Sequence, residues 1–395
     1  MEEAFFRTHT YLVEHTEAPV RRTLMDEIDW NDRMIGIKGT RGVGKSTFLL
    51  QYAKEHFGPY DRKCLYVNMN NFYFQSRGIA DFAGDFVNQG GRTLLIDQVF
   101  KQQDWSKELR KCYDLYPELK IVFTGSSVMR LKEENPELNG IVKSYNLRGF
   151  SFREYINLKT GNDFQPYELE DILRNHEHII KQILPEVSPM KYFNDYLHHG
   201  FYPFFLEQRN FTENLLKTMN MMTEVDILLI KQIELKYLPK IKRLFYELAV
   251  EGAKAPNVSQ AESINTSRAT VMNYIKYLAD SRLINMIYPE GQDFPKKPSK
   301  VMMHNTNLMY AIYPIQIDKQ EVMETFFVNS LWKDHKVHQG GKDHYYTVDG
   351  NRKFRICDAQ TPNKMRSNPD TIYARYNTEV GKDNKIPLWL LGFLY

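Results

Sequence analysis

The chain has little of what defines disulfide-rich or zinc-binding proteins. Only three of its 395 residues are cysteines, namely Cys64, Cys112 and Cys357, and no two of them form a C-x-x-C pair. This wide spacing excludes a disulfide framework and a cysteine-rich zinc site. It fits the reducing cytoplasm, which is the location we expect for this protein.

Long apolar runs and an excess of one charge are also missing. No apolar run reaches the roughly 18 residues of a membrane span, and the start Met-Glu-Glu-Ala-Phe-Phe-Arg lacks the basic and apolar regions of a signal peptide. Lys and Arg number 52 and Asp and Glu 49, so the formal net charge is +3. We therefore expect no membrane partner and no global attraction to nucleic acid, whereas a local basic patch is left open.

What the chain does contain is one uninterrupted phosphate-binding motif. The run Gly39-Thr40-Arg41-Gly42-Val43-Gly44-Lys45-Ser46-Thr47 matches G-x-x-x-x-G-K-[ST] at every position. The apolar stretch Met34–Lys38 predicts a strand before it, and Phe48–Ala53 predicts a helix after it. Glycines let backbone N–H groups approach phosphate oxygens, and the helix N-terminus adds its positive dipole end. We expect Lys45 to reach the β- and γ-phosphates and Ser46 to ligate Mg²⁺.

Short apolar stretches alternate with amphipathic ones from about residue 34 to residue 150. The predicted strands are Met34–Lys38, Cys64–Asn68, Thr93–Ile96, Lys120–Thr124 and Tyr145–Arg148, with a helix at Ser106–Tyr116 among the connections. Such alternation predicts an α/β fold, with a parallel sheet and helices on both faces. Ligands of such sheets bind at the carboxyl ends of the strands.

A carboxylate follows the third of these strands, Leu94-Leu95-Ile96-Asp97. Asp97 is placed to hold Mg²⁺ through its water shell, unless this is an ordinary strand ending in a polar turn. The next residue is Gln98, where many P-loop ATPases have a Glu that activates water. An amide accepts a hydrogen bond from water but cannot take its proton, so hydrolysis should be slow unless another carboxylate substitutes. Two origins of Gln98 stay open: a natural loss, or a substitution introduced to trap nucleotide.

A polar residue also follows the next strand. Lys120–Phe123 leads directly into Thr124-Gly125-Ser126-Ser127. A hydroxyl at this strand end can hydrogen-bond the γ-phosphate or the attacking water, which makes Thr124 a candidate sensor. A plain strand-to-helix turn is the alternative.

Four domains are predicted: residues 1–150 bind nucleotide, 151–235 form a helical lid or connector, 236–315 form a winged helix-turn-helix, and 316–395 form a small α+β domain. Residues 151–235 show no strand pattern. In the third domain helices are predicted at Ile241–Val250, Val258–Ser263 and Thr270–Ser281, with wing strands at Leu283–Ile284 and Val301–Met303. In the fourth, a helix is predicted at Val322–His335, and strands at His344–Val348, Lys353–Cys357 and Leu388–Tyr395.

A winged helix suggests a partner. Recognition helices present polar side chains to the major groove of DNA, and basic wing residues meet phosphates. The groove candidates are Arg268, Asn273 and Lys276, and the wing candidates are Lys296, Lys297 and Lys300. These charges are few, and winged helices also dock proteins, so a DNA partner and a protein partner both stay open.

Together these motifs resemble the bacterial and archaeal AAA-type ATPases that carry an appended C-terminal domain of unknown function. The resemblance extends over essentially the whole chain. Its landmarks are Ile28–Arg33, Gly39–Thr47, Leu95–Asp97, Thr124–Ser127, Leu147–Tyr155, Lys297–Lys300, Asn305–Tyr310 and Ile386–Phe393. It implies ATP as the nucleotide, a helical part, a winged helix and a C-terminal domain similar to restriction endonucleases. No guanine-reading N-K-x-D motif is present.

The chain departs from that family in three places. The acidic pair has Gln98, and Asn139-Gly140-Ile141 stands where the family often has Ser-Arg-Arg, so an arginine finger is missing. Arg41, Arg130 and Arg148 are candidates to replace the arginine finger, but none stands at the family position. In the C-terminal domain Arg355 stands where a nuclease needs a carboxylate, which argues against metal binding there, and Asp349 reads as a turn residue.

Three functional hypotheses follow. The first is an ATP- and Mg²⁺-binding, nucleotide-dependent switch with slow or lost hydrolysis. The second is a competent ATPase motor or remodeller in which Gln98 was introduced as a trap. The third is a DNA-binding regulator that uses ATP for assembly. A homo-oligomer is left open in each case, because a second subunit can supply an Arg to the γ-phosphate.

Overall fold

The computed structural model describes residues 2–129, 131, 134–207, 210–341, 345–360 and 368–395. The chain divides into two compact units, Met1–Gly149 and Phe150–Tyr395. Each unit is described by itself below. Within the described ranges, no helix combines the length and the apolar character needed to cross a membrane.

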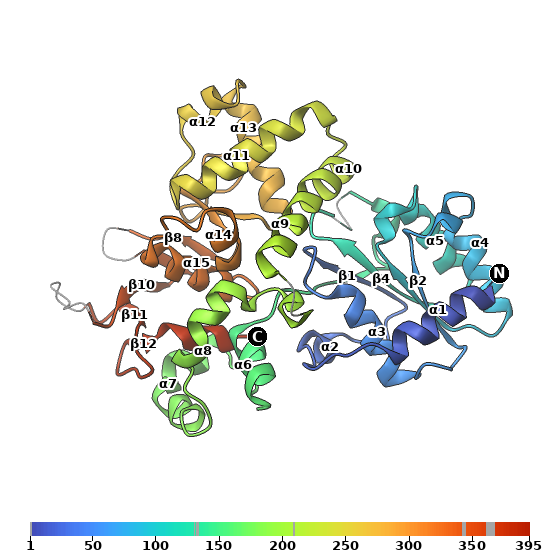
Figure 1. Ribbon diagram of the computed structural model, residues 1–395, viewed down its shortest axis with the longest axis horizontal. Coiled ribbons are helices and arrows are strands. Elements are labelled where there is room, and N and C mark those ends of the chain that lie inside the picture. Colours follow the sequence, from blue (N-terminus) through green and yellow to red (C-terminus); the bar gives the residue numbers. More distant parts are fainter. Residues whose placement is uncertain (1, 130, 132–133, 208–209, 342–344, 361–367) are drawn as a thin grey trace. The chain divides into compact units, whose positions relative to one another are not determined.

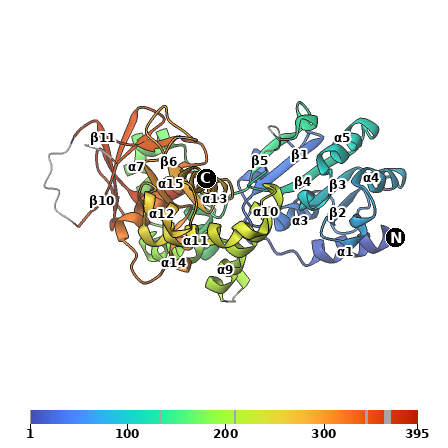
Figure 2. The same ribbon diagram turned by 90° about the horizontal axis from the view of Figure 1, so that it is seen from above.

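The first unit is built on a five-stranded parallel sheet. Its strands are β1 (Met34–Gly39), β2 (Cys64–Asn68), β3 (Thr93–Asp97), β4 (Lys120–Ser126) and β5 (Lys143–Asn146). They lie in the order β2-β3-β4-β1-β5, and every neighbouring pair is parallel. Figure 1 labels β1, β2 and β4, and Figure 2 labels each strand of this sheet. The predicted α/β class is therefore confirmed.

The helices of the described part of this unit are α1 (Glu2–Glu14), α2 (Leu24–Glu27), α3 (Lys45–His56), α4 (Ile79–Asn88) and α5 (Trp105–Leu115). Figure 2 shows α1, α3, α4 and α5 beside the sheet. Helix α1 packs on β2 and α3, and α4 packs on α5. Because both faces are covered, the central strands are continuous apolar runs, and Leu94, Leu95 and Ile96 of β3 have no exposed surface.

Helices dominate the start of the second unit. They are α6 (Phe152–Thr160), α7 (Leu169–Ile183), α8 (Met190–Asp195), α9 (Phe211–Met221) and α10 (Leu228–Ile230), with π-helical turns at Tyr196–Gly200 and Met222–Ile227. Helix α6 begins with a capping box, in which the Ser151 hydroxyl accepts from the Glu154 N–H and the Glu154 carboxylate accepts from the Ser151 N–H.

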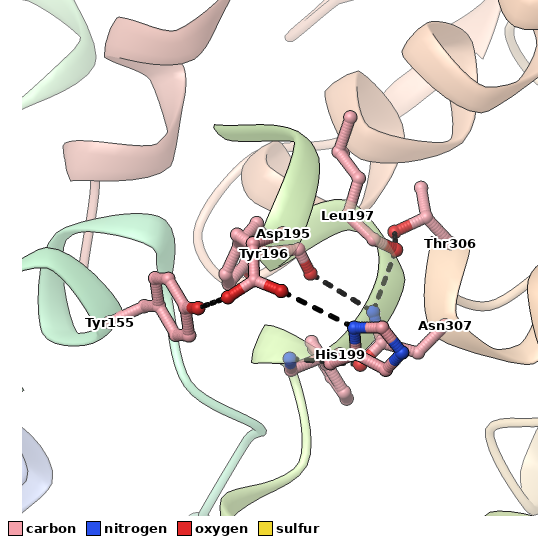
Figure 3. Close-up of polar contacts among 8 residues, drawn as sticks. Tyr155, Asp195, Tyr196, Leu197, His199, Thr306 and Asn307 are labelled. Atoms are coloured by element: carbon pink, nitrogen blue, oxygen red, sulfur yellow. Dashed lines mark hydrogen bonds and ion pairs between the residues drawn. The ribbon is translucent and has the colours of Figure 1, made fainter. Parts of the chain in front are cut away.

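A buried asparagine joins distant segments of this unit (Figure 3). The side-chain amide of Asn307 donates to the carbonyls of Tyr196, at 3.1 Å, and Leu197, at 2.8 Å. Its oxygen accepts from the backbone N–H of Phe201 at 2.9 Å. Beside it the Tyr155 hydroxyl donates to Asp195. One side chain thus satisfies backbone groups around a π-helical turn, where regular helical bonding is interrupted.

Three helices and a hairpin come next. They are α11 (Leu238–Glu251), α12 (Val258–Ser263), α13 (Arg268–Asp280), β6 (Ile284–Ile287) and β7 (Lys300–Met303), and β6 pairs antiparallel with β7. The Ser267 hydroxyl caps α13 by accepting from the Thr270 N–H at 3.1 Å. This order of elements follows the expected one, and the winged-helix identification itself stays a prediction.

The end of the chain forms a second sheet. Its elements are α14 (Thr306–Ile312), α15 (Lys319–Leu331), β8 (Val337–Gln339), β9 (Tyr346–Val348), β10 (Arg352–Asp358), β11 (Thr371–Tyr376) and β12 (Lys385–Pro387). The strand order is β12-β11-β10-β9-β8, parallel from β10 to β12 and antiparallel from β8 to β10. Helix α15 covers this sheet through Phe327, whose ring lies against those of Tyr346 and Phe354.

One expectation in this region is wrong. The stretch Leu388–Phe393 is a 3₁₀-helix, whereas the sequence predicts a strand over Leu388–Tyr395. All six of its residues are buried. A continuous apolar run has no polar face to reveal its period, so sequence alone cannot distinguish a buried strand from a buried helical turn. The expected strand His344–Val348 begins outside the described residues, and β9 covers its last three positions.

Candidate nucleotide-binding site

The glycine motif forms the connection between β1 and α3. Strand β1 ends at Gly39, and α3 begins at Lys45. Gly42 and Gly44 have φ angles of 84° and 92°, in the left-handed region that glycine adopts without strain. At Gly39 an added Cβ would lie 2.4 Å from the Leu147 carbonyl oxygen, so only glycine fits. The motif therefore has the backbone of a tight loop leading into a helix N-terminus, as a phosphate cradle requires.

Lys45 folds back over this loop. Its ammonium donates to the carbonyl oxygens of Gly39 and Thr40, each at 2.8 Å. These bonds hold the positive charge beside the loop whose backbone is expected to surround phosphates. The placement suits a lysine that is to meet the β- and γ-phosphates.

Ser46 and Asp97 are joined directly. The Ser46 hydroxyl, in the first turn of α3, donates to Asp97 Oδ2 at 2.7 Å. Because its proton points to the carboxylate, the lone pairs of the hydroxyl oxygen remain available to a cation. The two predicted Mg²⁺ residues, 51 positions apart in sequence, are therefore brought together.

Asp97 lies at the centre of a hydrogen-bond cluster at the end of β3. Only 1% of its surface is exposed, and Tyr66 Oη and Asn68 Nδ2 also donate to Oδ2, at 2.8 and 3.0 Å. The Thr124 hydroxyl donates to Oδ1. Burial raises the pKa of the Tyr66 phenol, and the charge of Asp97 raises it further, so Tyr66 stays a donor at neutral pH. Buried carboxylates are stable only with such partners.

Gln98 and Thr124 are linked to each other as well as to Asp97. Gln98 has φ 55° and ψ 48°, left-handed values that are uncommon outside glycine. Its backbone N–H donates to the Thr124 hydroxyl oxygen at 2.9 Å, and Thr124 is fully buried. The Thr124 hydroxyl thus bridges Asp97 and the Gln98 backbone. In this position it orients the end of β3.

Sequence reasoning missed three supporting residues. Tyr66 and Asn68 lie on β2 beside β3, and Asn68 pairs with Asp97 in the strand register. A polar residue at the end of the neighbouring strand was the available signal. Ser126, two residues beyond Thr124 on β4, lies opposite Gly39 and is 3% exposed. Alternation along a strand places Thr124 and Ser126 on the same face.

Arg22 is the fourth residue that the sequence did not single out. It precedes α2, is 7% exposed, and donates to the carbonyl of Val43 inside the loop at 3.1 Å. It also donates to the carbonyls of Arg148 and Gly149, at 2.6 and 3.2 Å. Among the finger surrogates, Arg41 lies in the loop, Arg148 follows β5, and Arg130 lies outside the described residues.

The C-terminal sheet has a different chemistry. Arg355 lies on β10 over the Tyr345 ring, with 5.2 Å between its guanidinium carbon and the ring centroid. Asp349 has a positive φ of 52° in the turn between β9 and β10. Its carboxylate accepts from the Lys336 N–H and from Arg352, at 2.9 and 3.0 Å, and bonds the His335 ring at 2.8 Å. Across the described part of the chain, no group of three His, Cys, Asp or Glu residues is arranged to hold a metal.

Two of the expected DNA-contacting lysines are already paired. Lys276 donates to Asp280 at 2.5 Å, and Lys300 donates to the 8%-exposed Glu324 at 3.0 Å. The Lys300 charge is therefore shared with a carboxylate, and contact of these residues with DNA stays a prediction. Lys296 and Lys297 are exposed, as are Arg268 and Asn273.

The residues around the loop fit a magnesium nucleotide. Mg²⁺ is bound by oxygen ligands, keeps several waters, and uses one or two protein groups together with phosphates. The Ser46 hydroxyl and the Asp97 carboxylate supply such oxygens next to Lys45 and the left-handed glycines. Lys45 would hold the phosphates, and Ser46 with Asp97 would hold the metal.

Comparison with known proteins agrees with this geometry. Residues 31–156, less than half of the chain, match the family described as AAA domain. No curated protein matches the sequence. A solved structure that does match is that of PCH-2 from C. elegans, at 17% identity over 38% of this chain and 42% of that one. Its TM-score of 0.24 is too low to indicate function. Residues 31–156 thus resemble an AAA domain in sequence, and the parallel sheet with its glycine loop is consistent with that fold.

Proposed function

We propose that this protein binds ATP with Mg²⁺ and acts as a nucleotide-dependent switch whose hydrolysis is slow or lost. The observation that carries the binding half is the Ser46–Asp97 hydrogen bond of 2.7 Å. It joins the helix after the loop to the end of β3, beside the Lys45 ammonium. ATP, rather than another nucleotide, rests on the family resemblance.

The slow-hydrolysis half rests on Gln98. A general base contributes about 10²–10⁴-fold to rate, and the Gln98 amide cannot accept a proton. An arginine finger is worth roughly 10³–10⁵-fold in kcat, and Asn139-Gly140-Ile141 has no arginine to provide it. The alternative is a competent ATPase in which Gln98 was introduced. Such a protein would regain hydrolysis when Gln98 is replaced by Glu.

The test is Gln98→Glu, measured as phosphate release at saturating ATP and Mg²⁺. If the protein is a switch, the chain binds nucleotide and the variant gains less than about 10-fold, because the arginine is still missing. A gain of about 100-fold or more would contradict the proposal and support the trapped ATPase. The double variant Lys45→Ala/Gln98→Glu is the matched control, since activity that survives loss of Lys45 does not come from this site.

The roles of the other regions are further parts of the proposal. We place a helical lid or connector at 151–235, a winged helix at 236–315 and an α+β domain at 316–395. The pairing of Lys276 and Lys300 leaves a DNA-contacting surface with fewer free charges than its sequence suggests. This supports a docking or structural use of the region over a DNA-binding one.

A further inference from the structure

Arg22 occupies a position that the nucleotide chemistry alone does not explain. Its guanidinium is buried and donates to two separate pieces of backbone. One piece is the loop, at the Val43 carbonyl. The other is the stretch after β5, at the carbonyls of Arg148 and Gly149.

The second piece is where the chain leaves the first unit. Gly149 is the last residue of that unit, and Phe150 is the first of the next. Within the second unit, the Phe150 N–H donates to the Phe201 carbonyl at 2.8 Å, and the Phe150 carbonyl accepts from Tyr196 Oη at 2.8 Å. Tyr196 and Phe201 both bond the side chain of Asn307. Figure 3 labels Tyr196 and Asn307. Gly149 is therefore held by a hydrogen bond within the first unit, and the next residue, Phe150, by hydrogen bonds within the second.

Guanidinium chemistry suits this task. Its planar fork carries five N–H donors and no acceptor, so one side chain can hold several carbonyls in fixed directions. A lysine is a compact charge on a flexible stem and cannot reproduce that geometry. A methionine of similar length would leave the buried carbonyls without this donor.

We propose that Arg22 is a positioning residue that couples the conformation of the glycine loop to that of residues 148–149. Nucleotide binding would then change the backbone at the point where the chain leaves the first unit. This inference rests on the proposed function, because it needs nucleotide to enter the loop. When phosphate binds and orders the loop backbone, the Val43 carbonyl orders the Arg22 guanidinium. Arg22 in turn orders the carbonyls of Arg148 and Gly149. Phe150 and its cluster receive the change through the covalent chain.

Hydrogen exchange on the full-length protein tests this, read by mass spectrometry with and without ATP and Mg²⁺. In the wild type, nucleotide slows exchange in peptides covering 39–47 and 145–151. In Arg22→Met, the Kd of a fluorescent ATP analogue rises about 10-fold, the size of one lost charge-assisted hydrogen bond. At nucleotide concentrations that fully protect 39–47, protection of 145–151 is lost in this variant. Arg22→Lys restores it in part.

Arg21→Met is the matched control. Arg21 is the neighbouring arginine, and its side chain is 46% exposed and paired with Asp26 and Glu55 at 2.7 and 2.8 Å. Removing it should change neither the Kd nor the protection of 145–151. Equal protection of 145–151 in wild type and Arg22→Met overturns the inference, as does a wild type that protects 39–47 alone. If Arg22→Met fails to fold, the protection of residues 145–151 in Arg22→Lys is compared with that in the wild type and tests the same inference. A wild type that binds no nucleotide contradicts the proposed function itself.

Discussion

Asp97 in the first sheet and Asp349 in the second differ in burial and in hydrogen-bond partners. Asp97, at the end of β3 in the first sheet, is 1% exposed and is held by four side-chain donors, one of which belongs to the phosphate loop. Asp349, between β9 and β10 in the second sheet, has a 30%-exposed side chain that accepts from the Lys336 N–H and pairs with His335 and Arg352. One carboxylate joins the elements around the glycine loop, and the other ties a turn to residues 335 and 336.

This contrast shows that two sheets of one chain can place a carboxylate at a strand end in different chemical surroundings. The second sheet has a strand order and a covering helix of its own, but Arg355 lies where the resemblance calls for a metal-binding carboxylate. The first sheet keeps the loop, the lysine and the paired Ser46 and Asp97 together. Function therefore has to be argued from each site and not from the sheet that carries it.

The largest expected effect comes from replacing each of these carboxylates by its amide. Asp97→Asn places an NH₂ group among buried donors and removes charge-assisted hydrogen bonds, so the unfolding free energy should fall on the order of 4 kcal/mol. Asp349→Asn keeps a residue that tolerates a positive φ and loses partly exposed ion pairs, so it should cost less than about 1 kcal/mol. Urea unfolding of both variants gives the comparison.

Asp97→Asn should also abolish the Mg²⁺-dependent part of nucleotide binding, and Asp349→Asn should leave it intact. Similar losses of stability in the two variants would remove the distinction between the sheets. So would retention of Mg²⁺-dependent binding in Asp97→Asn.

A somewhat smaller effect is expected from His9, which supports β2 in the first unit. His9 is 1% exposed, its Nδ1 accepts from the Tyr66 N–H at 3.1 Å, and burial lowers its pKa to about 4. The unfolded chain, with an ordinary histidine pKa near 6.5, binds this proton first as pH falls. Stability is therefore complete above about pH 6.5 and declines by about 3 kcal/mol toward pH 4.

His9→Gln isolates this contribution, because glutamine can accept the same hydrogen bond and does not titrate. Its unfolding free energy should vary less between pH 6.5 and 4 than that of the wild type. His15→Gln, at an exposed position directly after the same helix, should keep the wild-type slope. Parallel pH profiles for the wild type and His9→Gln would show that His9 is not the sensitive group.

Much of the first sheet could be predicted from the sequence. Strand β2 has the predicted bounds, and β1, β3 and β4 begin at the predicted residues. Buried parallel strands are short, continuous apolar runs bounded by turn residues, which makes them easy to recognise. Strand β5 starts two residues before the predicted strand. Its residues are mostly exposed and polar, so they show no apolar pattern that would mark the start of a strand. Helix α1 was not predicted.

Side chains whose partners are brought to them only by tertiary contacts could not be predicted. Arg22 acts through three backbone carbonyls, two of which lie more than 120 positions away in sequence, and carbonyls have no sequence signature. Lys300 reads as a free wing charge until α15 brings Glu324 to it. The buried run Leu388–Phe393 reads equally as strand or helix. In each case tertiary contacts decide, and local pattern does not.

The central claim is that the first sheet holds nucleotide through Lys45 and the loop around it. A ligand that binds the folded state raises stability by RT ln(1 + [L]/Kd), about 2.7 kcal/mol at 100 times Kd. The most direct test is thermal unfolding of the wild type and Lys45→Ala, each with and without ATP and Mg²⁺. Tm should rise clearly for the wild type and stay unchanged for Lys45→Ala, whereas equal shifts in the two proteins would show that nucleotide does not bind through Lys45.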